Sequence, residues 1–148
     1  MSVNQVYIDG GTGKHRKLIK LSSSCFTDIQ KKALLGLHAF TGNDFVSSFF
    51  RKGKLISWNI IKKNNNHLTT LCQIGCATQI PDILMIALEN FVFRVYGDKR
   101  NTSEKDARAT IFWKKFNRTN TAIDLSLLPP CRRSLVKHAK RENYTVII

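Results

Sequence analysis

Apolar residues along this chain recur first with the spacing of strands and then with the spacing of helices. The segment 5–21, QVYIDGGTGKHRKLIKL, has two apolar runs on either side of a Gly-rich turn, which predicts a β-hairpin. From Thr27 onward, apolar side chains recur three and four positions apart, as in amphipathic helices. The pattern predicts a mainly α protein of the α+β class, with a hairpin over 1–21, a helix–turn–helix region over 27–62 and a helical region over 67–148.

Polar residues and glycines predict where the helices begin and end. Thr27 and Gln30 have the spacing of a capping box, and Gly42 is expected to end the helix that they start. A second helix is expected over 44–51, and a turn at Gly53 then leads into a third helix. Later helices are expected from Pro81 to Gly97, over 104–118 and over 131–144.

Length and charge limit the number of domains and the kinds of partner that this protein can have. A chain of 148 residues with 43% hydrophobic content suits a single globular domain, here spanning 1–148. The net charge is +14, and it lies at the two ends of the chain. Residues 1–63 carry eleven Lys and Arg against three acids, 64–100 carry three of each sign, and 101–148 carry ten against four. Two cationic regions favour polyanionic partners, nucleic acid first and anionic lipid second. The alternative is a protein that is merely basic.

The sequence also predicts an intracellular protein. Its first residues, MSVNQVYIDGG, contain no basic and apolar leader, and the longest apolar stretch, 83–95, is interrupted by polar residues. The four cysteines do not have the density of a disulfide framework. We therefore expect no membrane association, and a nucleic-acid-binding protein is expected in the nucleus.

Two long stretches resemble a known family. LLGLHAFTGNDFVSSFFRKGK, over 34–54, is similar to the motif LxxxHAFTGCDTxSxFFGKGK, and LPPCRRSLVKHAKRENY, over 128–144, is similar to LPPxxxxLxxHxxRANY. Both motifs occur in this order in a large group of largely uncharacterised animal proteins with a mobile-element-like distribution. VYIDGGTGKHRKLIKL and FVFRVYGD fit the same pattern, so the resemblance covers nearly the whole chain.

Within that group, the Phe-Thr-Gly-x-Asp segment is similar to a signature of PIN and flap-endonuclease-like nucleases. The resemblance implies that Asp44 matches a carboxylate that binds catalytic Mg²⁺ or Mn²⁺. It also implies that Lys52-Gly53-Lys54 matches a turn between helices that grips the DNA backbone. Asn43, Phe45 and Arg51 depart from the family motif, which has Cys, Thr and Gly there. The other nuclease carboxylates come from upstream strands, so the chain resembles the C-terminal part of a longer nuclease-like protein.

Asp44 therefore has two interpretations. As a metal ligand it would be the catalytic candidate, but two-metal hydrolysis needs several converging carboxylates and no other acid here has a metal-site context. As a helix cap it would pair with Thr41 in an S/T-x-x-D arrangement, which we favour. We therefore expect no cofactor, or Mg²⁺ or Mn²⁺ if the protein is a nuclease. A zinc site would use His67, Cys72 and Cys76 as ligands. We instead expect Cys72 and Cys76 to pack in the core from one helical face.

Two groups of basic residues are the candidate nucleic-acid-binding sites. The first surrounds the predicted turn, and the second follows helical spacing on the last helix; they are Arg51, Lys52, Gly53 and Lys54, and Arg133, Lys137, Lys140 and Arg141. A turn joining two helices often requires positive φ or close backbone approach, which we expect at Gly53. The competing interpretation of each group is a solvated surface.

Three functions remain open from the sequence. The first is DNA or other nucleic-acid binding through the backbone, in a nuclease-like protein that is catalytically incomplete alone. The second is a protein-interaction or regulatory module whose basic faces meet acidic partners. The third is a metal-dependent, structure-specific nuclease completed by missing acids. The free edge of the strand at 6–8 predicts self-association, or a partner that supplies missing strands.

Overall fold

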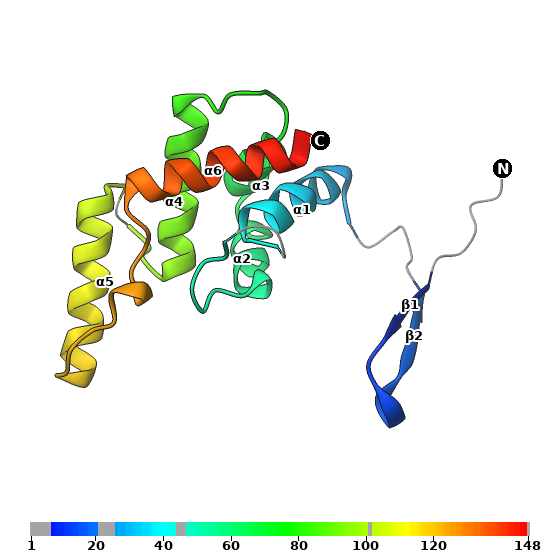
Figure 1. Cartoon of the computed structure of the whole chain (residues 1–148), viewed down its shortest axis with the longest axis horizontal. Helices are drawn as coiled ribbons and strands as arrows, with labels where there is room; N and C mark the ends of the chain where they lie inside the picture. The colour runs from blue at the N-terminus through cyan, green and yellow to red at the C-terminus, as the bar shows by residue number, and fades with distance from the viewer. Residues whose placement is uncertain (1–6, 21–25, 44–46, 101, 148) are drawn as a thin grey trace.

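The computed structural model describes residues 7–20, 26–43, 47–100 and 102–147 of the chain. It confirms a mainly helical protein with a small N-terminal antiparallel hairpin. Figure 1 shows the helices gathered together and the hairpin standing apart from them. Within the described ranges, no helix has the length and apolar character needed to cross a membrane.

The hairpin consists of β1 (Tyr7–Gly10) and β2 (Lys17–Lys20), joined through the 3₁₀ turn Gly13–His15. Tyr7 pairs with Lys20 at the open end. Arg16 Nε donates to both Asp9 carboxylate oxygens, at 2.8 and 2.9 Å, and this guanidinium lowers the pKa of Asp9. The two strands pair only with each other in the described sheet, so each has an open edge. Self-association through such an edge stays a prediction.

Six α-helices follow in the described part of the chain, and local sequence explains several of their ends. They are α1 (Asp28–Phe40), α2 (Lys54–Ile61), α3 (Asn65–Cys72), α4 (Asp82–Tyr96), α5 (Glu104–Thr119) and α6 (Arg132–Ile147). Thr27 and Gln30 form the expected capping box, because each side chain hydrogen-bonds the other's backbone N–H. Gly97 ends α4 with φ 95°, as predicted.

The core lies where α1, α3, α4 and α6 meet. Leu88, Phe91 and Val92 on α4 are completely buried, and α1 packs against both α3 and α6. The α1–α3 contact is unusually close: a Cβ added at Gly36 would lie 2.1 Å from the carbonyl oxygen of Leu71. A glycine is therefore required where these two helices touch.

The predicted helix over 44–51 is wrong for the part that the structure describes. Residues 47–49 have no regular secondary structure and 50–51 form a turn, while 44–46, including Asp44, lie outside the described residues. Thr41 ends α1 instead of starting a helix, and its hydroxyl donates to the Leu37 carbonyl at 2.6 Å. The described residues between α1 and α2, 41–43 and 47–53, thus contain no helix, and the predicted helix–turn–helix is wrong for this part of the chain. The apolar spacing is helical, but Phe49 is buried from a segment without helical structure.

The expectation for the two central cysteines is confirmed only in part, because Cys72 packs against the core and Cys76 does not. Cys72 is the last residue of α3, so Cys76 lies beyond the helix and is exposed. The Cys76 thiol donates to the Cys72 carbonyl at 3.2 Å. A turn at Gly75, with φ 83°, separates them, so they share no helical face.

Candidate nucleic-acid interface

The two family-like motifs meet at His138, on the buried side of α6. Its Nε2 lies 2.8 Å from the carbonyl oxygen of Phe40, the last residue of α1. A carbonyl can only accept, so Nε2 carries the proton of the neutral ring. The ring centroid lies 5.0 Å from that of Phe49 in the loop that follows α1. His138 therefore holds α6 against two residues of the first motif, Phe40 at the end of α1 and Phe49 in the loop that follows.

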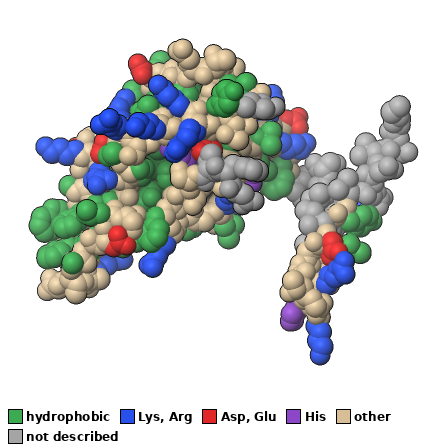
Figure 2. All heavy atoms as spheres, viewed as in Figure 1, with side chains coloured by type: hydrophobic (Ala, Val, Ile, Leu, Met, Phe, Trp, Pro, Cys, Tyr) green, Lys and Arg blue, Asp and Glu red, His purple; other side chains and the backbone are tan. Residues whose placement is uncertain are grey.

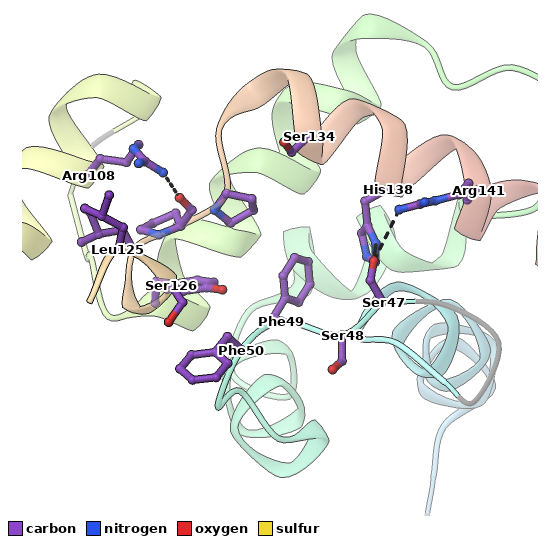
Figure 3. Close-up of a pocket in the computed structure, with 14 residues that line it drawn as sticks. Ser47, Ser48, Phe49, Phe50, Arg108, Leu125, Ser126, Ser134, His138 and Arg141 are labelled. Carbon is purple, nitrogen blue, oxygen red and sulfur yellow. Dashed lines mark hydrogen bonds between the residues drawn. The ribbon is translucent and has the colours of Figure 1, made fainter. Parts of the chain in front are cut away.

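The other ring nitrogen faces polar partners (Figure 3). His138 Nδ1 lies 3.3 Å from the Ser47 hydroxyl, to which Arg141 Nη2 also donates at 3.4 Å. Glu142 Oε1 is 3.6 Å from the same nitrogen. Serine and glutamate thus approach one ring nitrogen while the other is bound to a carbonyl. A nucleophile–base–acid relay needs its members on opposite ring nitrogens, so this arrangement is structural and holds the loop to α6.

Glu142 is an acid in an apolar site. Its side chain is completely buried, and neither carboxylate oxygen has a hydrogen-bond partner among the described residues. Burial raises the pKa of Glu142 to about 7, partly opposed by the Arg141 charge. Burial likewise lowers the pKa of His138, so both groups are driven toward their neutral forms.

A cavity of about 320 Å³ opens beside this cluster. Its wall is aromatic, with Phe49, Phe50 and Tyr96, and four serine hydroxyls line it. Figure 3 shows Arg108 and Arg141 at its two ends. Arg108 donates to the carbonyl of Pro129, while Arg141 is exposed on α6. Residues of the loop after α1 and residues of α6 line this one cavity. The sequence had predicted two separate sites in these two segments.

The basic loop before α2 differs in detail from its prediction. The left-handed residue is Arg51, with φ 54°, whereas Gly53 has φ −71° and open space around it. The expectation of positive φ at Gly53 is therefore wrong. Lys54 donates to the Gly42 carbonyl, so its ammonium holds the loop in place. The sequence could not predict this contact between Lys54 and Gly42, because it depends on the tertiary conformation of the loop.

The remaining two cations of the loop lie over aromatic rings. The Arg51 guanidinium is 5.2 Å from the Phe50 centroid, and Lys52 Nζ is 4.9 Å from the Tyr96 centroid. Burial lowers the pKa of Lys52, and repulsion from Lys115 on α5 lowers it further.

The basic residues of α6 form its exposed face, as predicted. The side chains of Arg133, Lys137, Lys140 and Arg141 are exposed, and none has an ion pair with a described acid. Arg132 is different: its guanidinium binds Glu89 at 2.7 Å, and its backbone N–H binds Glu104 at 2.8 Å. Figure 2 shows Lys and Arg side chains gathered over α6.

The described residues contain no group of three or more His, Cys, Asp or Glu side chains that could hold a metal. Asp44, the candidate metal ligand and catalytic residue, lies outside those residues, so its assignment stays a prediction. Two cations were not among the predicted site residues: Arg108, which lines the cavity, and Lys115, which repels Lys52. The only sequence signal for them is their seven-residue spacing, which places both on one side of α5.

Comparisons with family models, with curated proteins and with solved structures give no match to this chain.

Proposed function

We propose that this protein binds the phosphate backbone of nucleic acid through the exposed face of α6 and the adjoining loop cations. The observation that carries the proposal is that Arg133, Lys137, Lys140 and Arg141 project together without acidic partners among the described residues. Cations without nearby acids raise the positive potential of a surface and attract polyanions. An unpaired row of cations matches the regular charges of a nucleic-acid strand.

Backbone contact, and not sequence reading, suits these residues. Lys and Arg on one exposed helical face can neutralise successive phosphates, while a face that also reads adenine edges carries Asn or Gln among them. The exposed α6 face contains no such group between Arg133 and Arg141. The resemblance to mobile-element-like proteins and to PIN or flap-endonuclease-like nucleases supports the same partner, and with it an intracellular, nuclear location.

The proposal predicts salt-dependent binding of DNA of any sequence. Each neutralised phosphate releases counterions, so the logarithm of the association constant should fall linearly with the logarithm of salt concentration. Fluorescence anisotropy of labelled duplex DNA measures this slope. Binding that is undetectable at low salt, or that does not change with salt, would overturn the proposal and favour an acidic protein partner.

A charge-reversal variant locates the surface. Arg133→Glu, Lys137→Glu and Lys140→Glu together should weaken DNA binding by at least about tenfold, and the salt slope should become shallower by about one unit for each phosphate that is no longer neutralised. The matched control is Lys17→Glu, Lys20→Glu and Lys62→Glu, which changes net charge equally at exposed sites outside α6. If the two triple variants lose the same affinity, net charge drives binding and the α6 face has no special role.

A further inference from the structure

Three aromatic side chains lie together on α5. The rings of Phe112 and Phe116 are nearly parallel, with centroids 6.0 Å apart, and Trp113 contacts both edge-on at 5.5 and 5.8 Å. Trp113 is 57% exposed. Phe112 and Phe116 are half-buried, and Phe112 also packs against the edge of the core.

Cations alternate with these rings along the helix. The segment 112–118 reads FWKKFNR, so Lys114, Lys115 and Arg118 come from the same two turns of α5 as the aromatic side chains. None of the three pairs with a described acid, and the acids of α5, Glu104 and Asp106, lie in its first turn. Figure 2 shows hydrophobic side chains gathered over α5 with Lys and Arg side chains nearby.

The mixture of aromatic and cationic residues on α5 indicates which kind of ligand this face would bind. The core of a protein–protein interface is poor in lysine, because burying an ammonium without an acid is costly. A ligand that presents flat apolar surfaces and regularly spaced negative charges satisfies both the rings and the cations. Unpaired nucleotides have this chemistry, since bases stack on aromatic rings and phosphates meet Lys and Arg. In a duplex the base faces are covered by their neighbours.

We propose that Phe112, Trp113 and Phe116 form a stacking surface for the unpaired bases of single-stranded nucleic acid. Lys114, Lys115 and Arg118 bind its phosphates. This inference rests on the proposed backbone binding and adds a substrate class to it: nucleic acid with an unpaired segment.

The test compares Trp113→Ala with wild type on single-stranded oligothymidylate and on duplex DNA, both by anisotropy at one salt concentration. Removing one stacking ring should weaken single-strand binding by about tenfold and leave duplex binding within about twofold. Trp113→Phe keeps an aromatic face and should retain most of the affinity. Tyr7→Ala, which removes an aromatic residue that is 50% exposed on β1, is the matched control and should bind as wild type.

A second readout follows the indole directly. In a Trp58→Phe background, Trp113 is the only tryptophan, and its fluorescence should be quenched by the single strand but not by the duplex. Unchanged single-strand affinity in Trp113→Ala, with duplex binding intact, overturns this inference and leaves backbone binding standing. Absence of binding to either nucleic acid overturns the proposed function itself. If Trp113→Ala instead abolishes self-association of the wild-type chain, a second copy covers this face and the inference is wrong.

Discussion

Gly36→Ala is expected to destabilise the protein by about 3 kcal/mol, the largest effect of any single methyl group in the described helices. The added Cβ would lie 2.1 Å from the Leu71 carbonyl oxygen, and this neighbour is backbone that cannot rotate away. Helices α1 and α3 would have to separate, which would open the contact that both make with the core. The gain in helix propensity from Gly to Ala, about 1 kcal/mol, is too small to offset this.

Gly53→Ala is the matched control for this experiment. Gly53 has φ −71°, and a Cβ there would meet nothing within 4 Å. The free energy of unfolding of Gly53→Ala should stay within about 0.5 kcal/mol of the wild-type value. Urea unfolding followed by circular dichroism gives both values. A Gly36→Ala protein as stable as wild type would show that α1 and α3 are not in backbone contact in solution.

The second large effect concerns pH. The folded protein holds a proton on Glu142 up to about pH 7, while the unfolded chain releases it near pH 4.5. Between these values the folded state binds more protons, so the free energy of unfolding falls as pH rises. Glutamine has nearly the same shape and cannot ionise. Glu142→Gln should therefore match wild type near pH 4 and be more stable above pH 7, by about 3 kcal/mol at most.

Urea unfolding of both proteins at intervals from pH 4 to 8 tests this prediction. His138 contributes in the opposite direction, because its lowered pKa makes stability rise with pH below about 6.5, but it is present in both proteins. Asp106→Asn, at an exposed carboxyl of α5, is the control and should show no such divergence. If the stability difference between Glu142→Gln and wild type is constant with pH, Glu142 is not a buried neutral acid.

Local sequence signals predicted the helix ends well. The capping box at Thr27 and the left-handed Gly97 were recognisable because each depends on residues within a single turn. The exposed basic face of α6 was predicted for the same reason: helical spacing alone places Arg133, Lys137 and Arg141 on one side. These features need no knowledge of the tertiary structure.

The loop before α2 could not be predicted in this way. Phe49 has the apolar spacing of a helix, but it is buried because it contacts Phe40 and His138, which come from other parts of the fold. Glu142 is a different case: its spacing from Leu135 and Ala139 places it on the buried face of α6, but a carboxylate is seldom expected in a core. Its burial follows from the docking of α6 against α1, and no local pattern records that contact.

The contact between α6 and α1 also has a consequence for protein synthesis. His138 on the last helix binds the carbonyl of Phe40, so two segments 98 residues apart must meet before the core closes. While the ribosome is still making α2 to α5, the faces of Leu37 and Phe40 that α6 will cover stay open to water. The nascent chain thus emerges with an incomplete core, and its final folding step has to wait for the C-terminal helix to leave the exit tunnel.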